Sequence, residues 1–177
     1  MRLANRMSLL KTESSFVVLA KANQLEREGR NIIHLEIGDT DFDTPSNIIN
    51  VVCDQVSSGN THYCPSSGVL ELREACCDWI NKNKRGEYSP DEIVIGPGGK
   101  PFLYYTIMAT AGEGDEVIYP DPGFPVYESV TLYAGAKPVP LPILEENNFK
   151  FTIDDLKNRI SKNTRLLILN YPHNPTG

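Results

Sequence analysis

The sequence predicts an α/β protein in which a mainly parallel β-sheet is flanked by helices and preceded by an N-terminal helical portion. From residue 93 onward, short apolar runs typical of buried strands alternate with amphipathic segments typical of helices. Such alternation indicates parallel strands joined by crossover connections. Before residue 86, helix and loop signals dominate instead. The chain has 177 residues, enough for roughly one to one and a half domains.

Helical periodicity dominates the N-terminal part. Three segments carry it: 16–28, 47–57 and 69–83. Gly29 ends the first of them, since glycine readily adopts the left-handed conformation that terminates helices. Between the first two helices, residues 32–37 alternate enough to predict a short strand that would pack His34 inside. Loops rich in turn residues are expected at 38–45 and 59–68.

The C-terminal part alternates regularly between the two kinds of element. Strands are expected at 93–95, 116–119, 137–141 and 165–170. Helices are expected at 101–111 and 125–133, with a third opening at Thr152. Thr152 is followed three residues later by Asp155, a pattern typical of a capping box in which each side chain bonds the other residue's backbone N–H.

Composition and charge exclude several classes of function. A net charge of −6 argues against a nucleic-acid-binding surface, which would be basic. No apolar run approaches the roughly 18 residues that a membrane helix needs. Residues 1–15 lack an apolar core of signal-peptide length, which predicts a cytoplasmic protein. Hydrophobic residues make up 40% of the chain, which is ordinary for a globular protein.

The cysteines predict reduced, structural thiols rather than a metal site. Cys76 and Cys77 are adjacent, so on a helix they would point about 100° apart and chelate poorly. His62 and Cys64 could form half of a metal site, but no second pair has a matching spacing. We therefore expect no bound metal.

A glycine-rich turn, Gly96-Pro97-Gly98-Gly99-Lys100-Pro101, lies between a predicted strand and a predicted helix. Glycines let the backbone approach a ligand, and a helix N-terminus offers free N–H groups to an anion. The turn therefore suits a phosphate. It is not a Walker loop, because Lys100 precedes proline rather than serine or threonine. The alternative is an ordinary turn without a ligand.

Two further turns follow predicted strands, where open α/β sheets place their ligand-binding groups. In the first, Asp121-Pro122-Gly123-Phe124, the aromatic ring could present a flat face to an aromatic ligand; the alternative is a core anchor. The second is Tyr171-Pro172-His173-Asn174-Pro175-Thr176-Gly177, where Asn174 presents an amide beside a rigid proline. The chain stops there, in the middle of the predicted architecture, which suggests a fragment whose remaining chemistry lies in further residues.

The glycine-rich turn, the Phe124 turn and the Asn174 turn follow one another along the chain. Two further segments precede them: Gly38-Asp-Thr-Asp-Phe-Asp-Thr-Pro45 and Tyr63-Cys-Pro-Ser-Ser-Gly-Val-Leu-Glu-Leu-Arg-Glu-Ala75. Together they give a sequence that resembles the class I/II pyridoxal-phosphate aminotransferases of fold type I. The resemblance covers essentially all 177 residues. It implies that the predicted sheet is an incomplete copy of that family's large domain.

The resemblance implies a set of contacts to pyridoxal 5'-phosphate. Gly98, Gly99 and Lys100 look like the segment whose backbone holds the cofactor phosphate. Phe124 looks like the aromatic residue stacked on the pyridine ring. Asn174 looks like the amide that bonds the ring hydroxyl and helps to orient the substrate carboxylate.

Two further roles and a domain division follow from the same resemblance. Gly38 looks like the backbone position that contacts the substrate carboxylate. Tyr63 looks like the tyrosine that reaches across a homodimer interface to the neighbouring subunit's cofactor phosphate; its alternative is packing within its own loop. Residues 1–45 would form an N-terminal arm with part of a small domain, and 46–177 the truncated cofactor-binding domain.

The implied activity is transfer of an amino group between an amino acid and a 2-oxo acid. The family's Schiff-base lysine, its pyridine-nitrogen aspartate and its carboxylate-binding arginine lie beyond the Asn-Pro-Thr-Gly turn, so no catalytic residue is expected here. Lys100 lies in the phosphate turn and is not a substitute, which predicts that this chain alone is inactive. Alternatives are a pyridoxal-phosphate-dependent carbon–sulfur β-lyase and a non-catalytic binding or regulatory module.

The family pattern also predicts the geometry of two X-Pro peptide bonds. Asp121-Pro122 and Asn174-Pro175 are both expected to be cis, which would turn the neighbouring side chains toward the cofactor within two residues. Cis X-Pro bonds are a small minority in folded proteins, so each of these predictions is specific.

Overall fold

The computed structural model describes residues 3–10 and 14–177. The chain forms two compact units, one made of residues 1–37 with 99–177 and the other of residues 38–98. We refer to them as the sheet unit and the helical unit. The division expected from the family, 1–45 and 46–177, remains a prediction.

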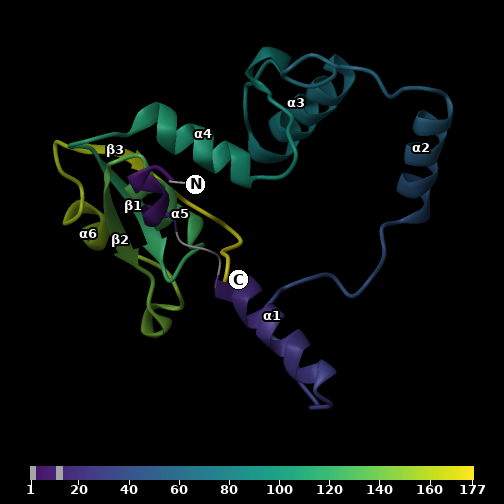
Figure 1. Cartoon of the computed structure of the whole chain (residues 1–177). Helices are drawn as coiled ribbons and strands as arrows, with labels where there is room; N and C mark the ends of the chain where they lie inside the picture. Colours follow the sequence, from purple (N-terminus) through teal and green to yellow (C-terminus); the bar gives the residue numbers. More distant parts are fainter. Residues whose placement is uncertain (1–2, 11–13) are drawn as a thin grey trace. The chain divides into compact units, whose positions relative to one another are not determined.

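A three-stranded parallel sheet organises the sheet unit. Its strands are β1 (Glu116–Asp121), β2 (Lys137–Pro142) and β3 (Thr164–Leu167), in the order β2-β1-β3 (Figure 1). In the central strand, Ile118 lies opposite Val139 on one side and Leu167 on the other. The predicted α/β fold with a parallel sheet is confirmed, and so is the strand rhythm from residue 116 onward.

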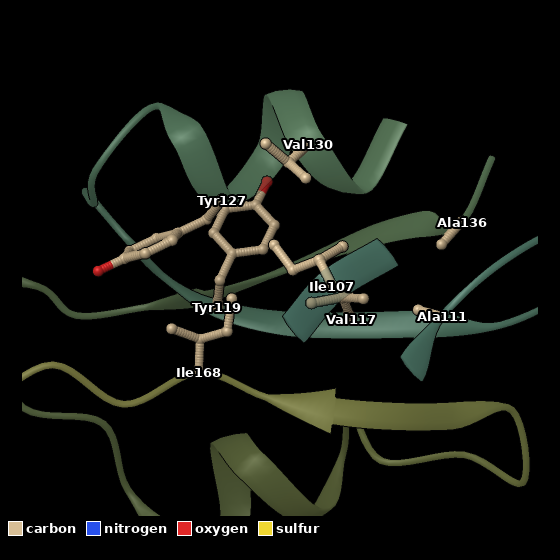
Figure 2. Packing of buried hydrophobic residues seen from close by; sticks show 8 residues of the cluster. All are labelled: Ile107, Ala111, Val117, Tyr119, Tyr127, Val130, Ala136 and Ile168. Carbon is tan, nitrogen blue, oxygen red and sulfur yellow. The ribbon is translucent and has the colours of Figure 1, made fainter. Parts of the chain in front are cut away.

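Helices connect and cover these strands. They are α4 (Lys100–Thr110), α5 (Val126–Tyr133) and α6 (Ile153–Lys157). Figure 2 shows the core between α4, α5 and the sheet, where Ile107 and Val117 are fully buried and the rings of Tyr119 and Tyr127 lie close together. Strand β1 is buried from Glu116 to Pro120, because α helices cover a parallel sheet and leave its strands out of water.

The start of α6 has the predicted capping box. The Thr152 hydroxyl accepts a hydrogen bond from the Asp155 N–H at 3.0 Å, and the Asp155 carboxylate accepts one from the Thr152 N–H at 3.0 Å. The Thr152 side chain, followed by its backbone N–H, lowers the pKa of Asp155 by bonding its charged form. A short 3-10 helix, η3 (Glu145–Asn147), precedes α6.

The N-terminal part of the sheet unit contains η1 (Asn5–Leu9) and α1 (Ser14–Arg27). The strand predicted at 32–37 is absent, and the expectation that His34 packs inside is wrong. Its ring is exposed and lies 2.6 Å from a Glu36 oxygen and 3.1 Å from a Glu26 oxygen. Hydrogen bonding to Glu36, then to Glu26, raises the pKa of His34. The alternating residues do not form a strand because the described residues offer them no neighbouring strand to pair with: the sheet consists of β2, β1 and β3.

The helical unit contains α2 (Ser46–Ser57), α3 (Leu70–Lys84) and η2 (Pro90–Glu92). Two side chains of α3 hold the segment that follows it. Arg73 donates to the Pro90 carbonyl at 2.8 Å, and Asn81 both donates to the Tyr88 carbonyl and accepts from its N–H at 2.8 Å. The strand predicted at 93–95 is absent.

The described residues contain no helix that is both long and apolar enough to cross a membrane. None of the four cysteines forms a disulfide. Cys77 is buried and donates a hydrogen bond from its thiol to the Tyr88 carbonyl at 2.9 Å, so it acts as a packed, structural residue.

Candidate cofactor site

The candidate site of the sheet unit is at the carboxyl edge of the sheet. Strand β1 runs into the turn containing Phe124, and β3 runs into the turn containing Asn174. Because β1 and β3 are parallel neighbours, these two turns leave the sheet at the same edge. Lys100 opens α4, which contacts β3. The sequence predicted turns after strands for Phe124 and Asn174 and a turn between a strand and a helix for Lys100, although the strand expected before Lys100 is absent.

The turn before α4 keeps space open for a ligand. Gly98 has a φ of +82°, a conformation that glycine adopts without strain. Gly99 is the N-cap of α4, and no described atom would lie within 4 Å of a Cβ placed there. Packing within the chain therefore does not explain why glycine occupies position 99. The first N–H groups of a helix have no intrahelical acceptors, so this end of α4 suits an anion.

Phe124 presents a partly exposed ring next to a cation. Its ring packs edge-on against Tyr127, with centroids 5.9 Å apart. The Lys100 ammonium lies 5.5 Å from the Phe124 centroid and 5.7 Å from that of Phe16. A Cβ at Gly123 would overlap the Pro120 carbonyl oxygen, so only glycine allows the tight turn that delivers Phe124. The structure thus brings the predicted aromatic residue and the predicted lysine together.

Asn174 is exposed at the tip of a closed turn. The Gly177 N–H donates to the His173 carbonyl at 2.7 Å, and the His173 ring nitrogen Nδ1 lies 2.8 Å from the Thr176 hydroxyl. The two predicted cis bonds, Asp121-Pro122 and Asn174-Pro175, are confirmed, and Tyr171-Pro172 is also cis.

Two residues for which the sequence predicted no role, Tyr127 and Asn170, adjoin these turns in the chain. The buried Tyr127 hydroxyl interacts with the side chain of Asn170; burial raises the pKa of Tyr127, and this bond partly offsets the rise. Burial, with the charges of Glu128 and Asp121, raises the pKa of Tyr119 to about 12. Available signals were the position of Tyr127 three residues after Phe124, in the first turn of α5, and the position of Asn170 just after β3.

A cavity of about 450 Å³ extends beside this edge of the sheet unit. It is lined by α4, by β3 with the residues after it, and by Tyr127. Its walls are mostly apolar side chains, and Gly99 and Asn170 contribute polar backbone or side-chain groups. Lys100, Phe124 and Asn174 are not among its lining residues. Of the predicted contacts of the cofactor, only Gly99 lines this cavity along α4 and β3.

The remaining predicted residues, Gly38, Tyr63 and Gly98, belong to the helical unit. Tyr63 is fully exposed in the loop between α2 and α3. Gly38 is exposed, and no described atom would lie within 4 Å of a Cβ there. Gly98 ends this unit.

Comparison with known proteins identifies the family. Residues 30–177 match the family described as aminotransferase class I and II. The chain belongs to this family.

Relatives of this aminotransferase chain cover it almost completely. The aspartate aminotransferase of Bacillus sp. (strain YM-2) is 38% identical over 175 residues, which are 99% of this chain and 45% of that protein. Among solved structures, the aspartate aminotransferase of Thermus thermophilus with maleate superposes with a TM-score of 0.94 at 32% identity, over 99% of this chain and 46% of that one.

A second solved structure, the alanine aminotransferase of Pyrococcus furiosus, has a TM-score of 0.92 at 28% identity, over 99% of this chain and 45% of that one. The aminotransferase chain thus spans less than half the length of the relatives it matches. The match also confirms the fold type I assignment, since these neighbours share the parallel sheet and its helices.

The residues of this aminotransferase chain suit a flat, phosphorylated ring. A partly exposed aromatic face, an exposed amide and an open helix N-terminus occur in one unit, and the ammonium of Lys100, the first residue of that helix, lies 5.5 Å from the centroid of the aromatic ring. A pyridine ring with a phosphate group needs each of these: a surface to stack on, a partner for its ring hydroxyl and donors for its phosphate.

Proposed function

We propose that this chain is the N-terminal part of a pyridoxal-phosphate-dependent aminotransferase that moves an amino group between an amino acid and a 2-oxo acid. The observation that carries the proposal is the grouping of Phe124, Lys100 and Asn174 around the carboxyl edge of the sheet, in a chain of the aminotransferase family. A cytoplasmic location and a homodimeric assembly are part of the same proposal.

The residues of the sheet unit would hold the cofactor through three kinds of contact. The N–H groups at the start of α4, from Gly99 and Lys100, would donate to the phosphate, with Gly98 shaping the turn. The ring of Phe124 would stack on the pyridine ring. The amide of Asn174 would donate to the ring hydroxyl oxygen and orient the carboxylate of the substrate.

The chemistry that the bound cofactor supplies is an electron sink for negative charge at the α-carbon of the substrate. Phe124 and Asn174 would fix the ring against the substrate, which converts binding energy into orientation. Gly38 would present its backbone to the substrate carboxylate. The exposed Tyr63 would reach the cofactor phosphate of a neighbouring subunit in the homodimer. The lysine that takes up the α-proton is not expected among these residues.

The test is an assay of the complete protein with acidic, aliphatic and aromatic amino acids and a 2-oxo acid acceptor. Transfer of the amino group to the acceptor is expected. Release of ammonia and a thiol from a sulfur-containing amino acid, without an acceptor, would instead establish a carbon–sulfur lyase. The present chain alone should transfer no amino groups, and turnover by it would contradict the proposal.

Asn174→Ala tests the assigned roles within the complete protein. Losing a hydrogen bond to a charged group costs about 1.5–3 kcal/mol, so we expect a higher KM for the amino acid and a smaller loss of cofactor affinity. Absorbance of the bound cofactor and initial rates measure the two effects. An unchanged KM and an unchanged cofactor spectrum would show that Asn174 belongs to an ordinary turn.

A further inference from the structure

His173 is the residue directly before Asn174, and the proposed function gives it no role. Its side chain is buried, with 5% of the residue exposed, whereas Asn174 next to it is exposed. A buried ring adjacent to an exposed amide fixes the backbone from which that amide projects. Polar side chains are seldom buried unless they are hydrogen-bonded, so the contacts of this ring matter.

Both the backbone and the side chain of His173 close the turn. Its carbonyl accepts a hydrogen bond from the Gly177 N–H at 2.7 Å. Its ring nitrogen Nδ1 lies 2.8 Å from the Thr176 hydroxyl, within hydrogen-bond distance. In the sequence, Asn174 and Pro175 thus lie between His173 and the two residues that bond it, Thr176 and Gly177. We expect both bonds to fix the direction in which the exposed Asn174 side chain projects.

The surroundings of the ring favour its neutral form. The other ring nitrogen, Nε2, is buried and has no hydrogen-bond partner among the described residues. A protonated ring would place a positive charge and a second N–H there without an acceptor, which is costly. Burial accordingly lowers the pKa of His173 from its usual 6.5, and no charged group among the described residues contributes to that shift.

We propose that His173 is a positioning residue whose neutral imidazole, bonded to Thr176, locks the turn that presents Asn174 to the cofactor ring. The proposal rests on the proposed function, because it assigns the lock to the binding of pyridoxal phosphate. Thr176 can donate its hydroxyl proton to a neutral Nδ1 or accept one from it. A protonated ring can only donate at Nδ1 and would bury a positive charge and an Nε2–H that has no acceptor among the described residues, so proton uptake by His173 favours opening of the turn.

The first experiment tests the lock without any cofactor. Nitrogen NMR of the histidine rings in the chain is expected to show a neutral His173 at neutral pH, titrating below 6.5. Thr176→Val, which keeps the shape of threonine but removes its hydroxyl, should shift the Nδ1 resonance and broaden or move the Asn174 side-chain amide signals. The matched control Thr176→Ser keeps the hydroxyl and should leave both close to the wild-type values.

The second experiment measures the affinity of the complete protein for pyridoxal phosphate by equilibrium dialysis as the pH is lowered. His173→Asn is the matched variant, because its amide can bond Thr176 but does not titrate. The affinity of the wild type should fall relative to the variant by about two- to tenfold as His173 becomes protonated, the factor expected from one hydrogen bond. Protonation of the cofactor itself affects both proteins equally and cancels in the ratio.

The outcomes separate the possibilities. A His173 that titrates at or above 6.5, or Asn174 signals that do not respond to Thr176→Val, would overturn the lock. A confirmed lock with a pH-independent affinity ratio would overturn the positioning role and leave a structural one. If the complete protein binds no pyridoxal phosphate at any pH, the proposed function of this edge fails, while the NMR result on the lock stands by itself.

Discussion

The two edges of the same three-stranded sheet differ in how completely their polar groups are paired. At the amino edge, Glu116 accepts hydrogen bonds from Lys137 at 2.8 Å and from the Ser161 hydroxyl at 2.7 Å. Beside it, Asp115 accepts one from Arg165 at 3.1 Å. These contacts join the starts of β1, β2 and β3.

The carboxyl edge leaves polar and aromatic groups available. Asn174 is exposed, Phe124 is only partly covered and the Nε2 atom of His173 has no partner among the described residues. Parallel strands make this asymmetry possible, because every strand enters at one edge and leaves at the other. We infer that the amino edge stabilises the sheet and that the carboxyl edge is kept for binding, which is where open α/β sheets bind ligands.

The largest expected effect is at Ile118, because the central strand β1 supports both edges of the sheet. Ile118 is fully buried in the central strand, and its carbonyl accepts a hydrogen bond from the Ile168 N–H at 2.8 Å. Ile118→Ala should lower the free energy of unfolding by about 2–5 kcal/mol, because it leaves a cavity in the core. Denaturant unfolding measures the loss. The control Ile33→Ala, at a position that is 81% exposed, should change stability by less than about 0.5 kcal/mol.

The same substitution at opposite edges separates binding from stability. No described atom would lie within 4 Å of a Cβ at Gly99 or at Gly112. Gly99→Leu should weaken pyridoxal phosphate binding by about ten- to hundredfold, the cost of losing charge-assisted hydrogen bonds to the phosphate. Gly112→Leu, near the amino edge, should leave the affinity unchanged. Equal affinities for the two variants would contradict the division of roles.

Glu116 should make the stability of the amino edge depend on pH. The hydrogen bond from Lys137, then that from Ser161, lowers the pKa of Glu116 below its usual 4.5. Because the folded-state pKa is lowered, the stabilisation is fully present above 4.5 and is lost as the pH falls through the lowered pKa. Glu116→Gln should therefore lower the Tm near neutral pH, and the difference from wild type should shrink in acid. A constant difference across this range would show that the charge of Glu116 contributes nothing.

The smallest expected effect is at the exposed ion pair. The side chain of Arg165 is 64% exposed and that of Asp115 is 28% exposed, so solvent screens their attraction. Arg165→Gln should lower the free energy of unfolding by about 0.2–1 kcal/mol and should leave pyridoxal phosphate affinity unaltered. A double-mutant cycle with Asp115→Asn isolates the pair. A loss of cofactor affinity here would mean that the two edges are coupled.

Local patterns predicted the elements that bury a continuous apolar face. The strands at 116–119 and 137–141 are present, each within two residues of its predicted end, and the capping box at Thr152 is confirmed. The strands predicted at 32–37 and 93–95 are absent. A strand depends on hydrogen bonds to a neighbouring strand, and alternation along one segment cannot show whether a neighbour is present.

The candidate site shows the same limit. Phe124 and Asn174 could be placed at strand ends, because turn residues mark where a strand stops. Tyr127, Asn170 and the bond between His173 and Thr176 could not be found in this way. Their roles come from burial and from contacts between segments, which no local pattern contains.

The sequence by itself determined the alternation of strands and helices, the glycine and proline turns and the side chains available at each strand end, since these depend on local conformational preferences and apolar periodicity. The tertiary structure decided which strands became neighbours, which edge had its charges paired and which histidine was buried. These outcomes depend on removing side chains from water in three dimensions, where residues distant in the chain, such as Glu116 and Ser161, first meet.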